Sequence, residues 1–185
     1  MTYEDFKKIY EDLAAWRAER RLTVESQREG LIGNILEELA EVARAKNNDE
    51  KVGEICDIAV FAINAMDEIP SEEDFDCRTA IGTSRVDGGA KDIVYPLKMI
   101  TEDDLTFRAD EGANYFIAGI VIVCSRVIKT LGYDPAAAMS QTLQKINSRR
   151  GAYDETLKKW VKDTSDEARA QWFTPNYALC RVEKI

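Results

Sequence analysis

The stretch GEICDIAVFAINAMDEI, residues 53–69, holds the key to how this chain folds. It is apolar on nearly every side between Ile55 and Met66, which is typical of a helix buried at the centre of a core. The same run contains Asp57 and Asn64. A buried carboxylate costs free energy unless a partner offsets its charge. Asp57 therefore needs a partner, and the identity of that partner bears on what the protein does.

The segments on either side of this run predict an all-α protein. Apolar residues recurring at the helical period predict five helices, over residues 2–21, 26–46, about 50–69, about 111–131 and about 135–150. Residues that typically cap or stop helices stand at their ends: Thr2, Asp49, Pro70, Gly132, Asp134, Pro135 and Gly151. We therefore expect a helical bundle.

Two segments depart from a simple bundle. Residues 70–110 mix turn residues and glycines with one short apolar patch, so we expect an irregular insertion, partly loop, with room for short helices. Residues 151–185 form a C-terminal extension, in which the pattern allows a short hairpin near 157–161 and a short helix from Ser165. The prediction for the whole chain is one all-α domain over residues 1–185, a bundle of about five helices.

Composition excludes several classes of function. The chain has no histidine, which removes histidine-ligated zinc and every catalytic site built on a histidine base. Its net charge of −9 argues against nucleic acid as a partner. The apolar run 115–124 is too short to cross a bilayer and the N-terminus is too charged for a signal peptide, so we expect no membrane partner. Four widely spaced cysteines are typical of reduced thiols in a cytoplasmic protein.

Acidic residues recur at helical spacing on two neighbouring helices. The helix over 26–46 carries Glu37, Glu38 and Glu41, and the next one carries Glu54 and Asp57. A spacing of three residues puts Glu38 and Glu41 on one side of the first helix, and Glu54 and Asp57 on one side of the second. The short turn at 47–49 predicts antiparallel packing, so the four acids can face one another. Only a hard divalent cation, Mg²⁺ or Mn²⁺, offsets such repulsion with oxygen ligands.

These residues resemble a known family. The segments EELAE (37–41) and EICD (54–57) are similar to the Glu-Glu-x-x-Glu … Glu-x-x-Asp signature of the all-α nucleoside triphosphate pyrophosphohydrolases, the MazG-like group related to the dimeric dUTPases. The likeness continues in DIAVFAIN (57–64) and in AAAMSQTLQKINSR (136–149). It implies a Mg²⁺-dependent hydrolase of nucleotide metabolism that cleaves the α–β phosphate bond of a (d)NTP to give (d)NMP and pyrophosphate.

The resemblance also implies roles for individual residues. It makes Glu38, Glu41, Glu54 and Asp57 the Mg²⁺ ligands. It gives Asn64 a contact with nucleotide or metal, and Lys145 and Arg149 contacts with the phosphates; these two are four residues apart, on one face of the predicted helix. It makes Glu37 either a hydrogen-bond acceptor behind the metal ligands or the group that orients the attacking water. Because no histidine is present, a glutamate such as Glu37, Glu38 or Glu41 must accept or relay the proton.

Other features leave alternatives open. Trp16, Phe61 and Tyr115 are candidates for a base pocket, but core packing is the favoured explanation for each of them. The helix over 111–131 is apolar nearly all round, which predicts a homodimer or homotetramer.

Two functions compete with the hydrolase. One is a non-enzymatic helical interaction module whose acids are solvated, and the other is a carboxylate-bridged redox-metal protein. Within the enzyme class, house-cleaning of the nucleotide pool and specificity for dUTP or dCTP remain open.

Overall fold

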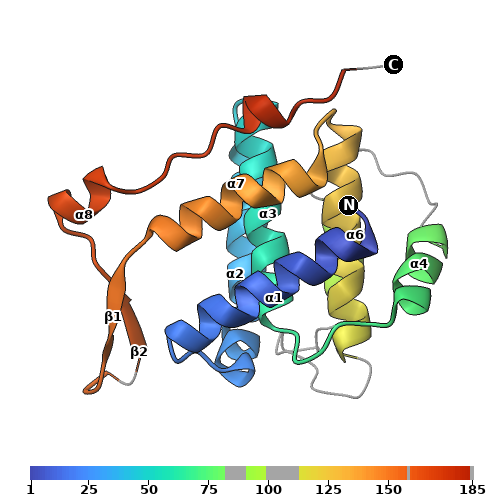
Figure 1. Cartoon of the computed structure of the whole chain (residues 1–185). Helices are drawn as coiled ribbons and strands as arrows, with labels where there is room; N and C mark the ends of the chain where they lie inside the picture. Colours follow the sequence, from blue (N-terminus) through green and yellow to red (C-terminus); the bar gives the residue numbers. More distant parts are fainter. Residues whose placement is uncertain (82–90, 99–112, 158, 184–185) are drawn as a thin grey trace.

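Five long helices form the body of the protein (Figure 1). The structure is a computed structural model that describes residues 1–81, 91–98, 113–157 and 159–183. The elements in these ranges are α1 (Tyr3–Glu19), α2 (Val24–Arg44), α3 (Asn48–Asn64), α4 (Glu72–Ile81), α5 (Lys91–Lys98), α6 (Ala113–Thr130), α7 (Pro135–Ser148), β1 (Gly151–Asp154), β2 (Lys159–Lys162), α8 (Asp166–Ala170) and the 3₁₀ turn η1 (Tyr177–Cys180). The all-α prediction is confirmed, with one small hairpin added.

Helix α3 lies at the centre, as its apolar sequence predicts. It contacts α1, α2, α6 and α7, and most of its residues between Val52 and Asn64 are buried. Helix α2 is joined to it by a turn of only three residues, so the two helices pack side by side as antiparallel neighbours. The core of the molecule thus forms where the other helices pack around α3.

The predicted ends of the central helix are wrong by several residues. Asn47, not Asp49, is the N-cap, and its side chain accepts a hydrogen bond from the backbone N–H of Glu50 at 2.9 Å. The helix ends at Asn64 rather than at Pro70. The chain leaves the helix because other elements bind the carbonyls that follow: Arg28 Nε donates to the Ala65 oxygen at 2.9 Å, and the Tyr10 hydroxyl donates to the Asp67 oxygen at 2.7 Å.

The segment 70–110 contains α4 and α5, and its remaining residues lie outside the described part of the chain. Helix α5 packs on α6, and α3 covers α6 from another side. Helix α6 is long and apolar enough to cross a membrane by length and composition, but half of the apolar window is buried inside the molecule, as in a core helix. Packing within one chain thus buries half of this helix, and the homodimer or homotetramer stays a prediction.

Contacts at both ends of the C-terminal extension hold it against the helical bundle. The hairpin β1–β2 and helix α8 form as the sequence pattern allows, with Ser165 as the N-cap of α8. Further along, the chain runs back over α7 and α3 (Figure 1). The N–H of Asp134 donates to the Cys180 oxygen at 2.8 Å, and Arg181 donates to Asp49 on α3 at 2.8 Å. Residues 173–183 are therefore a strap across these two helices.

We expect the core around α3 to dominate stability. The Ile58 side chain is fully buried, so Ile58→Ala should lower the free energy of unfolding by about 2–5 kcal/mol through lost burial and a cavity. Leu36 on α2 is 43% exposed, and Leu36→Ala should change it by less than about 0.5 kcal/mol. Urea denaturation of both variants measures the difference, and equal effects would contradict the central position of α3.

Candidate metal centre and adjoining cavity

Three of the predicted metal ligands come together between α2 and α3. Glu38 and Glu41 extend from α2 and Glu54 from α3, and one carboxylate oxygen of each lies within 4.8 Å of the others. The grouping arises because Glu38 and Glu41 are almost one turn apart and α3 packs antiparallel against that face of α2. Glu38 and Glu54 are half-buried, whereas Glu41 is exposed. The carboxylates thus meet at the edge of the core, open to solvent on one side.

The grouping changes the acidity of its members. The pKa of Glu38 is raised to about 8, first by burial and then by the negative charge of Asp57 and by hydrogen bonding to Glu54. The pKa of Glu54 is also raised, by burial and by the charge of Asp57. Both shifts have the direction expected where carboxylates are crowded without enough positive charge. A cation bound among these carboxylates would lower the pKa values of Glu38 and Glu54.

Asp57 finds its partner inside the protein. The Lys145 ammonium, which extends from α7, donates a hydrogen bond to the Asp57 carboxylate, and both side chains are more than four-fifths buried. Asp57 is outside the group of three but near enough to act on Glu38 and Glu54 electrostatically. The lysine predicted to bind phosphate therefore neutralises the predicted fourth metal ligand, and the assignment of Asp57 as a ligand stays a prediction.

The three glutamates fit a hard dication. An octahedral Mg²⁺ with ligand distances of 2.0–2.1 Å requires two of its ligand oxygens to lie about 3–4 Å apart. Carboxylate oxygens within 4.8 Å of one another reach that separation by small side-chain rotations. An all-oxygen donor set also suits Mn²⁺. Glu38, Glu41 and Glu54 are thus the residues that would hold the ion, with Asp57 beside them.

A cavity of about 330 Å³ adjoins the acidic group. Glu38, Asp57, Asn64 and Arg149, all predicted as site residues, contribute to its wall. This volume lies at the lower end of the range for small-molecule sites. Four residues separated by up to 111 positions in the sequence therefore line one cavity.

The polar and aromatic residues of the cavity come from several elements. Asn64 is almost completely buried, and its side-chain oxygen accepts a hydrogen bond from Arg17 Nη1 of α1 at 3.1 Å. Trp16 and Phe61, two candidates for a base pocket, line the cavity. Tyr115, the third, is 46% exposed on α6 and does not line it. Aromatic surface and an amide thus stand beside the acids.

Two predicted residues lie differently from the sequence-based expectation. Helix α7 ends at Ser148, and Arg149 adopts an extended backbone conformation, so Lys145 and Arg149 do not share a helical face. Lys145 turns to Asp57, while the Arg149 guanidinium lies 5.6 Å from the centre of the Trp172 ring. Glu37 is exposed on α2 and is not among the grouped carboxylates. Its role in orienting water stays a prediction.

The C-terminal extension supplies a part of the wall that the sequence did not assign to the site. Trp160 and Lys162 of β2 line the cavity, since residues two apart in a strand point to the same side. Arg20 at the end of α1 holds this hairpin: its guanidinium lies 4.5 Å from the Trp16 ring centre and 5.1 Å from that of Trp160. The alternating pattern of the residues in β2 was the signal available in the sequence. Such a pattern does not reveal which residues the strand packs against.

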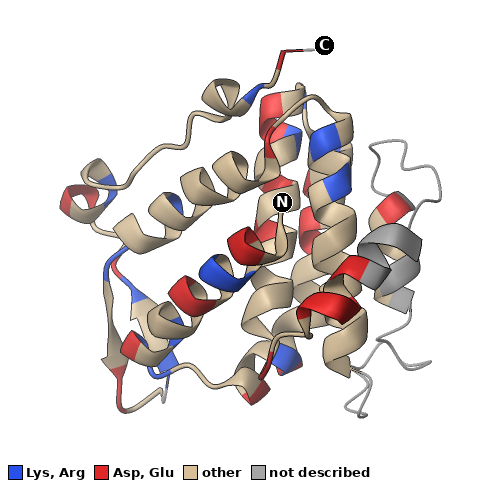
Figure 2. Ribbon diagram, turned by 45° about the vertical axis from the view of Figure 1, so that its right-hand side comes forward, with Lys and Arg blue, Asp and Glu red and all other residues tan. Residues whose placement is uncertain are grey.

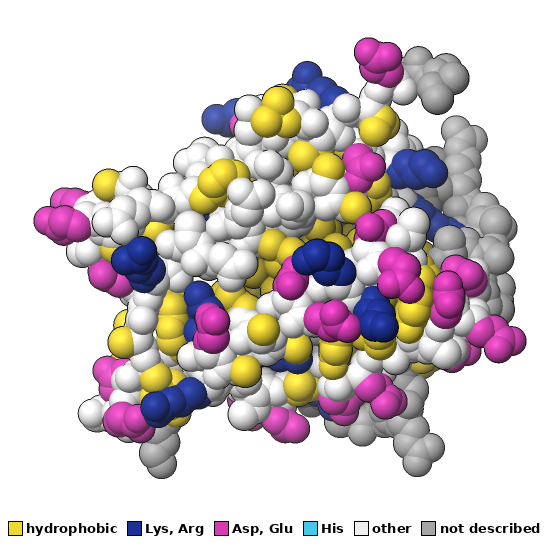
Figure 3. All heavy atoms as spheres, viewed as in Figure 1, with side chains coloured by type: hydrophobic (Ala, Val, Ile, Leu, Met, Phe, Trp, Pro, Cys, Tyr) yellow, Lys and Arg dark blue, Asp and Glu magenta, His cyan; other side chains and the backbone are white. Residues whose placement is uncertain are grey.

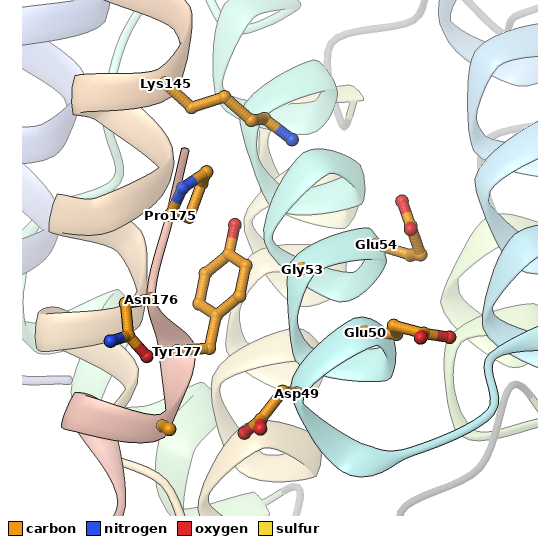
Figure 4. Close-up of a pocket in the computed structure, with 9 residues that line it drawn as sticks. Asp49, Glu50, Gly53, Glu54, Lys145, Pro175, Asn176 and Tyr177 are labelled. Carbon is orange, nitrogen blue, oxygen red and sulfur yellow. The ribbon is translucent and has the colours of Figure 1, made fainter. Parts of the chain in front are cut away.

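The strap lines a second hollow, of about 370 Å³, toward the N-terminal end of α3 (Figure 4). The Tyr177 ring lies against Gly53, where a Cβ would come within 3.0 Å of it, and its hydroxyl forms a 2.9 Å hydrogen bond with Thr142. Figure 4 shows Glu54 pointing away from Tyr177 and Lys145 reaching across from α7. The strap thereby fixes α7, and with it Lys145, against α3.

Comparison of the chain with models of protein families, with curated proteins and with solved structures finds no match.

The raised pKa of Glu38 predicts how stability depends on pH. Between the unfolded value of 4.5 and the folded value of about 8, the folded protein holds a proton that the unfolded chain has released. The free energy of unfolding in EDTA should therefore fall as the pH rises through this range. Mg²⁺ should raise the melting temperature more at pH 8.5 than at pH 5.5; at one hundred times its Kd it would add about 2.7 kcal/mol.

Thermal melts of two variants isolate this effect. Glu38→Gln should flatten the dependence on pH and weaken the response to Mg²⁺, whereas Glu29→Gln, an exposed glutamate of the same helix, should keep both. An unchanged pH profile in Glu38→Gln would contradict the raised pKa, and the absence of any Mg²⁺ response in the unmodified protein would contradict the metal centre.

Proposed function

We propose that this protein is a Mg²⁺-dependent nucleoside triphosphate pyrophosphohydrolase, with a MazG-like bundle, that cleaves the α–β phosphate bond of a (d)NTP and serves house-cleaning of the nucleotide pool. The observation that carries the proposal is the position of Glu38: it belongs both to a carboxylate group that fits a dication and to the wall of a cavity large enough for a small ligand. The resemblance of residues 37–41 and 54–57 to the family signature supports it independently.

The cavity has the charge distribution that a nucleoside triphosphate requires. Acids occupy one part of its wall, where a dication would be held, and the cations Arg149 and Lys162 occupy another. Trp16, Phe61 and Trp160 offer aromatic surface on which a base can stack. Substrate phosphates repel bare carboxylates, so binding of the substrate and of the cation would depend on each other.

The chain's own residues have distinct tasks in this reaction. Mg²⁺, when bound, neutralises charge on the transferring phosphoryl group and on the departing pyrophosphate. Glu38, Glu41 and Glu54 hold the ion, and the hydrogen bond from Lys145 orients Asp57 beside them. Arg149, which lines the same cavity, binds phosphate oxygens. A glutamate carboxylate, that of Glu37 or Glu38, accepts the proton of the attacking water.

The competing non-enzymatic interaction module needs acids that are solvated and independent. Glu38 and Glu54 are half-buried, and burial together with the charge of Asp57 raises the pKa of both, which favours the hydrolase. A homodimer or homotetramer remains part of the proposal, and sedimentation at micromolar concentration tests it separately.

The hydrolase makes a sharp prediction about products. Incubation with Mg²⁺ and a panel of NTPs and dNTPs should release pyrophosphate and a nucleoside monophosphate, measured by chromatography of the nucleotides. Glu38→Gln and Asp57→Asn should each lower kcat by about 10²-fold or more, since each removes charge at the reacting phosphates. Circular dichroism should report unchanged helix content in both.

The control is Glu29→Gln, which removes an exposed charge from the same helix and should keep full activity. Orthophosphate as the primary product would exclude α–β cleavage. Full activity in both Glu38→Gln and Asp57→Asn would remove the acidic group from the mechanism.

A further inference from the structure

Three cations gather round one tryptophan of the C-terminal extension. The Trp172 ring centre lies 5.6 Å from the Arg149 guanidinium, 5.2 Å from the Lys162 ammonium and 5.7 Å from the Arg169 guanidinium. We refer to these four residues as the cation–indole cluster. Basic residues of the hairpin and of α8 appear as blue segments at the left of Figure 2. The arrangement is unusual because like charges at such short range repel.

No carboxylate of the described residues pairs with these cations within 4 Å. Burial lowers the pKa of Lys162, and the nearby charges of Arg149 and Arg169 lower it further. Cation–π contact with one indole offsets only part of such repulsion. In a chain of net charge −9, a concentration of unpaired positive charge needs an explanation in terms of a ligand.

Hydrogen-bond donors without acceptors lie in the same region. Trp16 Nε1, Arg20 Nε and Trp172 Nε1 are buried, and none has a partner among the described residues. Arg20 is only 8% exposed, and it lies over Trp16 and Trp160, both of which line the cavity. Buried donors almost always have an acceptor. Excess donors beside excess positive charge match a ligand that offers only acceptors, and phosphate oxygens have this property.

The cluster borders the proposed active site. Arg149 and Lys162 belong to the cluster and also line the cavity that contains Glu38 and Asp57. A polyphosphate that reaches the acidic group through a dication can therefore extend toward the cluster. The three cations come from three elements, the end of α7, β2 and α8, so that only the folded extension brings them together.

We propose that the cation–indole cluster binds the pyrophosphate moiety of the substrate and, after cleavage, the pyrophosphate product. Its place in the reaction rests on the proposed function, whereas the binding of diphosphate by the cluster does not. A diphosphate presents more oxygens and more negative charge to three converging cations than orthophosphate does, so the cluster discriminates in favour of nucleotides with a long phosphate chain. Residues 151–172 are thus a part of the active site.

Intrinsic fluorescence tests this directly. The three tryptophans of the chain, Trp16, Trp160 and Trp172, all lie at the cavity or the cluster, so the whole signal originates there. Titration of the full chain with inorganic pyrophosphate in EDTA should give a saturable change. Orthophosphate at matched ionic strength should bind at least about 10-fold more weakly, as expected when one or more charged hydrogen bonds are lost.

Matched lysine variants of one strand provide the control. Lys162→Gln should raise the Kd for pyrophosphate by about 10-fold to 100-fold. Lys159→Gln removes the same charge from β2 but on the opposite side of the strand, and should leave the Kd within about twofold. Arg169→Gln is a second test should Lys162→Gln disturb the fold, which circular dichroism reports. A non-saturable response to pyrophosphate, or equal Kd values for Lys162→Gln and Lys159→Gln, would overturn the proposal.

Kinetics distinguish this proposal from the proposed function. If both hold, Lys162→Gln raises KM for the nucleotide and relieves inhibition by pyrophosphate, with a smaller effect on kcat. Pyrophosphate binding by a protein that cleaves no nucleotide would support the cluster and contradict the hydrolase. Nucleotide cleavage with an unchanged KM in Lys162→Gln would do the reverse.

Discussion

The repulsion among carboxylates between α2 and α3 is the constraint on which the rest of the molecule depends. The packing of these helices is driven by their apolar faces, and it carries Glu38, Glu41 and Glu54 to one place regardless of their charge. The molecule offsets part of the repulsion by proton binding, seen in the raised pKa of Glu38, and part by the Lys145 ammonium on Asp57. Proton binding and the Lys145 ammonium each offset only part of the repulsion, so the grouped carboxylates would still attract a cation. The proposed binding site for a dication would in this sense be a consequence of how the core packs.

The C-terminal extension brings positive charge to the cavity beside these carboxylates. Acidic and basic side chains are interspersed over the face seen in Figure 3, so no large field of one sign covers it. The cation–indole cluster is an exception in local terms, since Arg149, Lys162 and Arg169 converge without acidic partners in the described structure. Two of these cations, Arg149 and Lys162, line the same cavity as Glu38 and Asp57. Neither of the two cations forms an ion pair with an acidic residue of the described part of the chain.

Local chemistry made much of the fold predictable, and distance along the chain limited the prediction of the site. Thr2 with Asp5, Asp134 with Pro135, and Gly132 at a φ of +90° act through neighbouring residues, so their patterns could be recognised without tertiary information. The end of α3 could not, because Arg28 and Tyr10 from other helices bind the carbonyls beyond it. The grouping of the glutamates followed from helical spacing and a short turn. The partner of Asp57 lies 88 residues away, and the docking of the hairpin depends on cation–π contacts, which leave no periodic pattern in a sequence.

The order in which these parts are synthesised has a consequence for the nascent polypeptide. Helices α2 and α3 leave the ribosome early and can pair at once, since three residues join them. Lys145 follows 88 residues after Asp57, and the Arg21–Glu155 ion pair that helps to anchor the hairpin spans 134 residues. At ordinary rates of translation, synthesis of the chain between Asp57 and Lys145 takes several seconds. During that time the newly formed pair of helices α2 and α3 carries its acidic residues without Lys145. Cellular magnesium, or protons, would be the first counter-charge available to it, so the ion proposed for catalysis would also assist the earliest stage of folding.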